Sequence, residues 1–442
     1  MKTGVEVSSD INEWILASAS PRRQSLITQL GIFPQAIAAE IEEIAQPHES
    51  PSHFAERMAV EKALAVAHEA RGARFVIGGD TVVALGQRIL GKPTSRDDAQ
   101  EMLDQLSGQS HDVWSGWAIV EKCKAQVNIL QSGVSRSKVL MRDLTLGEIE
   151  SYVASGEPMD KAGSYGIQGL GGRFVTHLEG SLYSVIGLPL IELMNALKPF
   201  DTHRDWTLTE RGIRLRERVA TAAWRSGRPI DQVNVLAVSK KHSLESMIEA
   251  ARHGFCDFGE SYLNELIEKR PSFEHERTSS LTQSWASGTY SWHFIGALQT
   301  NKAKRIGSLA DWVHGLSRLE EAEKLSQGAM AKGHQLKSFI QVNLSGEESK
   351  GGIDPDQTLK LLEDCRGLPH LSICGLMTFP PLATPEESRP HFRALARLRD
   401  ELQGEGYSIP ELSMGTSDDF EVAIEEGATW IRPGRGLFGD RR

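Results

Sequence analysis

The sequence predicts an α/β protein of two domains, the second of them a (β/α)8 barrel of the TIM type. The first observation is the length of 442 residues, which is more than a single core usually holds. The second is that short apolar runs alternate with helical patterns along most of the chain, as strands and helices do in α/β folds. The third is that about eight such units follow one another after residue 213, the number that closes a barrel.

The first domain is expected over residues 1–199. Apolar strands are predicted at 14–19 and at 75–85, where the glycine pair of FVIGGDTVVAL suggests a turn within the run. A strand-rich stretch covers 113–142, and 182–198 combines strand and helix character. Helical patterns are expected over four segments: 20–30, 52–70, 95–106 and 146–155.

A change of texture separates the two domains. Residues 200–212 (FDTHRDWTLTERG) are polar and aperiodic, which predicts a linker. The second domain is expected over 213–442 and begins with a helix at 213–225. The polar segment 271–290 predicts a loop insertion. Strand-like runs recur between helical patterns, at 233–240, 255–258, 292–295, 311–313, 338–344, 372–376 and 430–431.

Composition excludes several classes of protein. The formal net charge is −10 and no basic run of five or more residues occurs, so binding of polymeric nucleic acid is not expected. The N-terminal segment has no apolar leader region and no run of eighteen apolar residues follows, so no membrane association is expected. The four cysteines form no C-x-x-C pair, which argues against a zinc cluster or a disulfide framework. A reducing cytoplasm is the expected compartment.

A first group of polar residues suggests a phosphate and metal site. The segment SASPRR (18–23) lies between a predicted strand and a predicted helix, where backbone N–H groups, hydroxyls and guanidinium groups can bind phosphate. A capped helix with two solvated arginines is an equally good interpretation of this segment alone. Carboxylates with nearby lysines suit Mg²⁺ or Mn²⁺ with a phosphate chain, although each charge taken singly is more often a surface residue. The candidates are Ser18, Arg22, Arg23, Glu43, Lys62, Asp80 and Lys92.

The motifs of this half resemble one known family. LASASPRRQSL, GGDTVV, LSGQSHDV, EPMDKAGSYGIQG and VIGLPL occur in the order and spacing of the Maf (septum-formation-inhibitor-like) nucleotide pyrophosphatases. The resemblance implies an ITPase-like α/β domain that hydrolyses a nucleoside triphosphate to the monophosphate and pyrophosphate with a divalent metal, and it allows a homodimer. It implies that Asp80 is the catalytic base and a metal ligand, that Glu43 lies at the metal, and that Arg22, Lys62 and Lys92 bind phosphates. Arg22, Thr81 and Gln168 match the subgroup that prefers dTTP and UTP.

A second group centres on Lys240. The run VNVLAVSKK places this lysine at the C-terminal end of the first predicted barrel strand, which is the end that carries active sites in such barrels. Taken alone, a surface lysine is the more common interpretation. The segments FGESYLNE, WHFIGALQTNK, QVNLSGEESKGG, GLMTF and LSMGTSDDFEVAIEEGATWIRPGRGLFG resemble the pyridoxal phosphate homeostasis family, which is similar to the N-terminal barrel of alanine racemase.

That resemblance implies binding of pyridoxal 5'-phosphate (PLP). Lys240 matches the lysine that forms a Schiff base with PLP, and Arg432 matches the arginine beside the pyridine nitrogen. The residues implied at the phosphate are Ser413, Gly415, Ser417 and Gly434. Three positions depart from the family pattern, namely Ser261, Thr416 and Arg435. His293 fits either a core histidine or a catalytic one.

Two alternatives stay open at this point. The first domain could be a nucleotide-binding regulator of cell division without turnover. The second could be an amino-acid racemase or lyase, but a racemase draws a second acid/base from a separate β domain, and no such sequence follows Gly439. We therefore expect a PLP-holding domain that acts in PLP homeostasis, fused to a nucleoside triphosphate pyrophosphatase.

Overall fold

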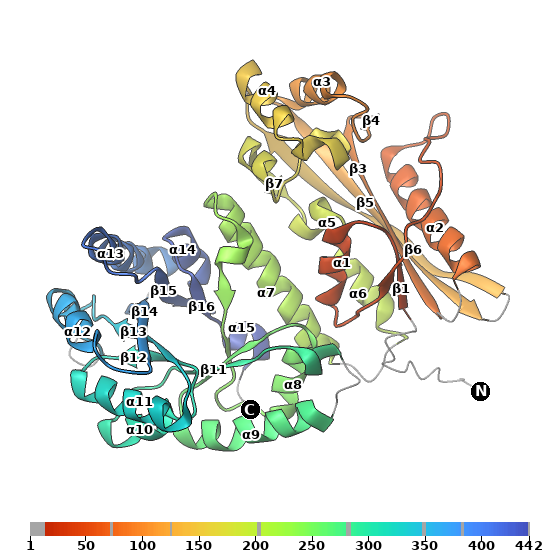
Figure 1. Cartoon of the computed structure of the whole chain (residues 1–442). Helices are drawn as coiled ribbons and strands as arrows, with labels where there is room; N and C mark the ends of the chain where they lie inside the picture. Colours follow the sequence, from red (N-terminus) through yellow and green to blue (C-terminus); the bar gives the residue numbers. More distant parts are fainter. Residues whose placement is uncertain are drawn as a thin grey trace. The chain divides into compact units, whose positions relative to one another are not determined.

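The computed structural model describes residues 14–70, 74–123, 126–200, 205–279, 284–346, 351–381 and 384–440. The chain forms two compact units that divide between Glu217 and Arg218 (Figure 1). No helix among the described residues is long and apolar enough to cross a membrane.

The N-terminal unit is built on one mixed sheet, in the strand order β2-β1-β3-β5-β6-β7, with β4 paired to β3. Strand β1 is parallel to β2 and β3, and the remaining pairs are antiparallel. The strands are β1 (Trp14–Ala17), β2 (Gln35–Ala36), β3 (Phe75–Leu85), β4 (Arg88–Leu90), β5 (Ser110–Cys123), β6 (Gln126–Met141) and β7 (Val175–Glu179). The α-helices are α1 (Pro21–Thr28), α2 (Pro51–Glu69), α3 (Arg96–Leu106), α4 (Leu146–Ala154), α5 (Leu182–Ile186) and α6 (Leu190–Leu197).

Glycines on β3 and β5 allow α2 to lie close to the sheet. A Cβ on Gly78 would lie 2.0 Å from the carbonyl oxygen of Ala59, and one on Gly116 would lie 2.0 Å from that of Ala55. Gly78 of FVIGGDTVVAL therefore serves helix packing within a continuous strand, and the turn expected there does not form. The close approach brings the middle of α2 over Asp80.

The segment 182–198 also differs from the expectation. It forms the two helices α5 and α6 and no strand. Gly187 has φ of +144° and Pro189 precedes α6, so the apolar run is interrupted between two short helices.

The C-terminal unit is the predicted barrel. Its parallel strands follow the order β8-β16-β15-β14-β13-β12-β11-β10-β9 within the described residues. Strands β8 and β9 are two parts of one stretch, and the Leu236 N–H between them donates to Ile431 O at 2.9 Å, so the ring closes. The strands are β8 (Asn234–Val235), β9 (Ala237–Val238), β10 (Asp257–Glu260), β11 (Ser291–Phe294), β12 (Trp312–Leu316), β13 (Leu336–Gln341), β14 (Leu371–Met377), β15 (Glu411–Thr416) and β16 (Trp430–Arg432).

A helix follows each strand of the ring, which confirms the (β/α)8 expectation. These helices are α8 (Leu244–Arg252), α9 (Leu263–Ser279), α10 (Thr300–Gly307), α11 (Leu319–Lys332), α12 (Thr358–Cys365), α13 (Pro385–Gly404), α14 (Phe420–Glu425) and α15 (Arg435–Phe438). Figure 1 shows them in chain order around the strands, from green to blue.

Helix α7 (Trp206–Arg225) begins within the segment proposed as a linker. Asp205 begins it, because its Oδ1 accepts the N–H groups of Thr207 at 3.0 Å and Leu208 at 3.3 Å. The second half of 200–212 is therefore helical, and 201–204 lie outside the described residues.

Helix α9 covers the first part of the segment 271–290, where a loop was expected. Phe273 on this helix is fully buried, and its ring lies 5.5 Å from that of Phe258 and 5.8 Å from that of Trp292. Burial of this aromatic side chain holds a polar, proline-containing segment in a helix, so the expectation of a loop was wrong for residues 271–279.

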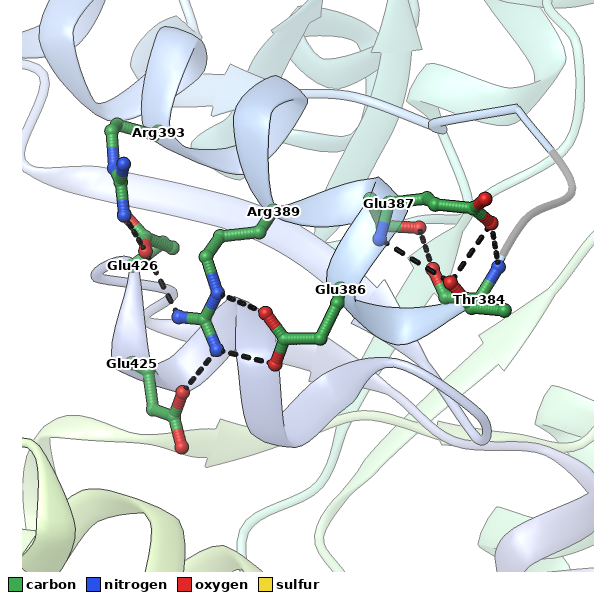
Figure 2. A network of polar contacts seen from close by, with 8 residues as sticks. Thr384, Glu386, Glu387, Arg389, Arg393, Glu425 and Glu426 are labelled. Atoms are coloured by element: carbon green, nitrogen blue, oxygen red, sulfur yellow. Dashed lines mark hydrogen bonds and ion pairs between the residues drawn. The ribbon is translucent and has the colours of Figure 1, made fainter.

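A polar network joins α13 to the end of α14 (Figure 2). Arg389 donates to carboxylate oxygens of Glu386, Glu425 and Glu426 at 2.7 to 3.0 Å, and these carboxylates raise the pKa of its guanidinium. Because α14 follows β15 directly, this network helps to anchor the strand that carries Ser413.

Candidate functional sites

The first site begins where β1 ends. Arg23 in the first turn of α1 donates from Nη2 to Thr81 Oγ1 at 3.0 Å, from Nη1 to Ser18 Oγ at 3.3 Å and from Nε to the Gly187 carbonyl at 2.9 Å. Burial lowers the pKa of Arg23, while the charges of Asp80 and Glu43 oppose the shift. Arg22 instead lies half-buried, 3.8 Å from an oxygen of Asp160. Of the two candidate arginines, Arg23 thus forms three hydrogen bonds within the unit, whereas Arg22 has a longer ion pair with Asp160.

A lysine between two carboxylates lies beside this arginine. Lys62 Nζ, from the middle of α2, is 2.6 Å from Asp80 Oδ1 and 2.6 Å from Glu43 Oε1. Lys62 and Asp80 are 7% and 5% exposed, whereas the Glu43 side chain is 41% exposed. Burial acts to raise the pKa of Glu43, but Lys62, Lys92 and Arg23 together bring that pKa below its ordinary value. The cluster therefore holds an ionised Glu43 at neutral pH.

The remaining candidates lie outside these hydrogen bonds. Lys92 is exposed and acts on Glu43 through its charge. Gln168 is exposed in the glycine-rich loop 166–172. The structure therefore brings together Ser18, Arg23, Thr81, Asp80, Lys62 and Glu43, and it leaves Arg22, Lys92 and Gln168 at the border of the group.

Glu157 orders the loop that carries Gln168. Its carboxylate accepts the N–H of Leu170 at 2.9 Å and the hydroxyl of Tyr152 at 2.8 Å. A Cβ on Gly169 would lie 2.3 Å from this carboxylate, so a larger residue there would require the Glu157 side chain to move. The sequence interpretation missed this role of Glu157, and the signal was the acid of EPMDKAG ahead of the glycine run.

The second site lies at the C-terminal ends of the barrel strands. Lys240 follows β9 and is half-buried. Arg432, at the end of β16, is 3% exposed; it donates to Ser413 Oγ at 2.6 Å and to the Thr378 carbonyl at 2.9 Å. Its guanidinium lies 4.3 Å from the centre of the Phe379 ring, and burial lowers its pKa to about 10. Arg432 Nε is buried and has no hydrogen-bond partner among the described residues.

Two buried histidines continue from Ser413 through the barrel. Ser413 Oγ is 2.7 Å from His314 Nδ1, His314 Nε2 is 2.9 Å from His293 Nδ1, and His293 Nε2 is 3.2 Å from Asp257 Oδ1. Burial lowers the pKa of both histidines, so both are neutral. The Asp257 carboxylate only accepts, so His293 donates to it from Nε2. Because both histidines are neutral, His314 then donates to His293, and Ser413 donates to His314. His293 is therefore an interior histidine with polar partners on both sides.

Ser417 gathers two backbone donors from the turn that follows β16. Its Oγ accepts the N–H of Gly434 at 3.1 Å and that of Gly436 at 3.0 Å. Gly415 has φ of +89°, and a Cβ there would lie 2.6 Å from the Cβ of Ala423, so this position needs glycine. The predicted residues Ser413, Gly415, Ser417, Arg432 and Gly434 thus lie on two adjacent strand ends.

The unusual residues of this turn have partners of their own. Thr416 donates through its N–H and hydroxyl to Asp419 Oδ1, at 2.6 and 3.0 Å. Arg435 pairs with Asp418 at the surface. This ion pair gives Arg435 a partner in the segment that follows β15.

Comparison with known proteins assigns both halves. A family model described as Maf-like protein matches residues 13–200, and one described as alanine racemase, N-terminal domain, matches residues 214–442. The chain is 46% identical over 187 residues to a dTTP/UTP pyrophosphatase of Bacillus anthracis, an alignment that covers 42% of this chain and 95% of that protein. It is 40% identical over 235 residues to a pyridoxal phosphate homeostasis protein of Aquifex aeolicus, which covers 53% of this chain and 98% of the relative. The chain belongs to both families. Among solved structures, PipY of Synechococcus elongatus with PLP bound is 34% identical with a TM-score of 0.43, covering 51% of this chain and all of that one.

The residues of the Maf-like unit fit a divalent metal. No group of three or more His, Cys, Asp or Glu side chains that could hold a metal occurs among the described residues. Mg²⁺, however, usually binds through one or two carboxylates and completes its shell with water and substrate phosphates. Asp80 and Glu43 already bind one cation together, the Lys62 ammonium. Their carboxylate oxygens are also the ligands that suit a divalent cation arriving with a nucleotide.

The residues of the racemase-like barrel fit PLP. The N–H groups of Gly434 and Gly436 converge on Ser417 Oγ, and donors that converge in this way can also bind an anion. Arg432 offers a buried N–H without a partner, and Lys240 offers an amine on a neighbouring strand end. Anion donors, a cation and an amine are the groups that a phosphorylated aldehyde requires.

Proposed function

We propose that the Maf-like unit hydrolyses nucleoside triphosphates, dTTP or UTP in particular, to the monophosphate and pyrophosphate. The cluster of Asp80, Lys62 and Glu43 carries the proposal, since it combines a buried carboxylate with the charge that a phosphate site requires. The 46% identity to dTTP/UTP pyrophosphatases supports the substrate class.

In this proposal Asp80 takes the proton of the attacking water. The water oxygen bonds to phosphorus, the anhydride between the α- and β-phosphates breaks, and pyrophosphate leaves. Arg22 and Lys92 bind the phosphates, and Lys62 keeps Asp80 oriented. Mg²⁺ or Mn²⁺, held by Asp80 and Glu43, would supply charge neutralisation when bound.

The base specificity is proposed to depend on Arg22, Thr81 and Gln168. The Gln168 amide offers both a donor and an acceptor to a pyrimidine edge. Thr81 is held by Arg23, which fixes the direction of its hydroxyl.

Pyrophosphate release from a panel of nucleotides with Mg²⁺ or Mn²⁺ tests this function. We expect Asp80→Asn to lower the rate with dTTP and UTP by about 10³-fold, the range for a lost general base. Asp104→Asn, a change of the same chemistry on the exposed side of α3, should have no effect. A wild-type chain that binds nucleotide but releases no pyrophosphate at any metal concentration would instead favour the division-regulator alternative.

For the racemase-like unit we propose covalent PLP binding through Lys240 and a role in PLP homeostasis. When bound, the cofactor supplies an aldehyde that condenses with amines. Lys240 provides the amine, Gly415, Ser417 and Gly434 form the phosphate site, and Arg432 lies at the pyridine nitrogen. Ser413, also implied at the phosphate, has its hydroxyl bonded to Arg432 and His314, so its proposed part is to hold Arg432. The 40% identity to a pyridoxal phosphate homeostasis protein supports this assignment.

Absorbance tests the cofactor proposal. The full chain with PLP should absorb near ~420 nm, and Lys240→Ala should lose this band. Lys332→Ala is the matched control, because Lys332 is an exposed lysine at the end of α11. Sustained racemisation of L-alanine that depends on Lys240 would overturn the role as a holder. A cytoplasmic location and a homodimer remain predictions.

A further inference from the structure

Three charged residues outside the predicted sites lie beside Lys240. Glu260 ends β10, and Glu265 and Lys269 lie one turn apart on α9. Lys269 Nζ is 2.9 Å from Glu260 Oε1 and 2.5 Å from Glu265 Oε2. We call these three residues the Lys269 cluster.

The cluster bonds to the residue before Lys240. The Ser239 hydroxyl donates to Glu260 Oε1 at 2.8 Å, and the Ser239 carbonyl accepts from Lys269 Nζ at 3.0 Å. Ser239 is fully buried. Lys269 thus has three acceptors for its three hydrogens, and one of them is the backbone next to Lys240.

The cluster also bonds to the residue after Lys240. The Lys241 N–H donates to Glu265 Oε2 at 2.8 Å. Lys241 has φ of +61°, a backbone conformation that residues other than glycine rarely adopt. Such a conformation needs support from surrounding contacts. Glu265 supplies such a contact at the point where the chain turns away from β9.

The burial of Glu260 is unusual for a residue with only a structural ion pair. Glu260 is 0% exposed, and its Oε2 has no partner among the described residues. Burial raises its pKa to about 7, against the charge of Lys269. A carboxyl group in this position costs stability, which suggests a functional reason for its presence.

We propose that Glu260, Glu265 and Lys269 are positioning residues that hold the backbone on both sides of Lys240 and so direct its amine toward the cofactor. The inference rests on the proposed PLP function. The side chains that hold Ser239 and Lys241 come from β10 and α9, so the aim of Lys240 depends on the second β/α unit of the barrel as well as on its own strand.

The test uses the full chain and two measurements. The first is the exchange rate of the Lys241 amide hydrogen in the protein without PLP. The second is the fraction of PLP that borohydride fixes to Lys240, measured by mass. We expect Lys269→Met and Glu265→Leu to speed the amide exchange and to lower the covalent fraction about tenfold at subsaturating PLP, since a misdirected amine reacts poorly. Glu265→Gln keeps an acceptor for the Lys241 N–H and should restore most of both properties.

Glu268→Gln is the matched control, because Glu268 is exposed on the same helix. The proposal is overturned if folded Lys269→Met and Glu265→Leu chains keep wild-type amide exchange and a wild-type covalent fraction. If Lys269→Met does not fold, the comparison of Glu265→Leu with Glu265→Gln tests the proposal by itself. If the wild-type chain attaches no PLP, the proposed cofactor function fails, while amide exchange still tests whether the cluster holds the Lys240 backbone.

Discussion

Both units of the molecule contain a lysine between two carboxylates, with nearly the same distances. In the Maf-like unit, Lys62 lies 2.6 Å from oxygens of both Glu43 and Asp80. In the barrel, Lys269 lies 2.9 Å from Glu260 and 2.5 Å from Glu265. The two clusters are alike in charge and geometry, so any difference in what they do must come from their surroundings.

The surroundings differ in two respects. Lys269 also binds a backbone carbonyl, that of Ser239, whereas Lys62 binds two carboxylates among the described residues. In addition, Glu43 is 41% exposed and its pKa is lowered, whereas Glu260 is fully buried and its pKa is raised to about 7. The Lys269 cluster is therefore the more buried of the two, since its acids are 0% and 22% exposed, against 7% and 41% for Asp80 and Glu43. We propose that this deeper burial keeps a metal ion away from the Lys269 cluster.

Within this comparison of the two lysines, the largest effect should follow removal of the lysine from the first cluster. Lys62→Met leaves Asp80 and Glu43 without their cation, so we expect pyrophosphate release to fall by about 100-fold or more. The same change should increase the affinity for Mn²⁺ without nucleotide, because two carboxylates without an ammonium attract a divalent cation more strongly. Calorimetric titration with Mn²⁺ measures this.

Lys269→Met makes the comparison sharper. Here Glu260 should take up a proton in place of the lost ammonium, since its carboxyl is buried, and Mn²⁺ affinity should not change. Equal gains of Mn²⁺ affinity in both variants would contradict the idea that burial separates the two clusters.

The second prediction concerns pH. The raised pKa means that native Glu260 keeps a proton between its ordinary 4.5 and about 7, where the unfolded chain has released it. The stability of the barrel should therefore fall as pH rises through this window, by on the order of 3 kcal/mol at most. Hydrogen exchange of β10 and β11 amides at about pH 5 and about pH 8 measures the slope, which Glu260→Gln should remove.

Glu43 should show the opposite sign. Its pKa is lowered in the native state, so its contribution is present above its ordinary pKa and is lost as pH falls through the lowered one. Glu43→Gln should flatten the acid side of the stability profile of the Maf-like unit. If stability changed with pH in the same direction for Glu43 and Glu260, the predicted difference between the two acids would be wrong.

Much of the fold followed from the sequence because hydrophobic periodicity is local. The ends of α2 and α3 lie within one residue of their expected positions. The exceptions are segments whose secondary structure depends on contacts with residues far away in the sequence. Phe273 is buried by an aromatic cluster from other elements, and β15 carries a glycine turn whose strand character depends on its neighbours β14 and β16.

The site residues show the same difference between what a local pattern predicts and what depends on distant contacts. A position at the end of a predicted strand indicates Lys240, and a position after a strand glycine pair indicates Asp80. Glu265 and Lys269 have the i, i+4 spacing of a solvated helix face, and that is the more common meaning of the pattern. Their contact with residues 239–241 depends on how α9 docks on β9, which no local pattern contains.

The smallest effect should come from a third charged cluster, the network of Figure 2, which is more exposed than the other two. Arg389→Ala removes its hub and should lower the stability of the barrel by about 1 kcal/mol, the upper range for partly exposed pairs. Arg393→Ala removes an exposed partner of Glu426 and should change stability less.

Raising the salt from about 0.1 M to about 1 M should reduce the Arg389→Ala effect through screening but leave the Lys269→Met effect nearly intact. Urea unfolding of the three variants at both salt levels tests this ranking, and equal salt dependence for Arg389 and Lys269 would mean that burial does not separate these clusters.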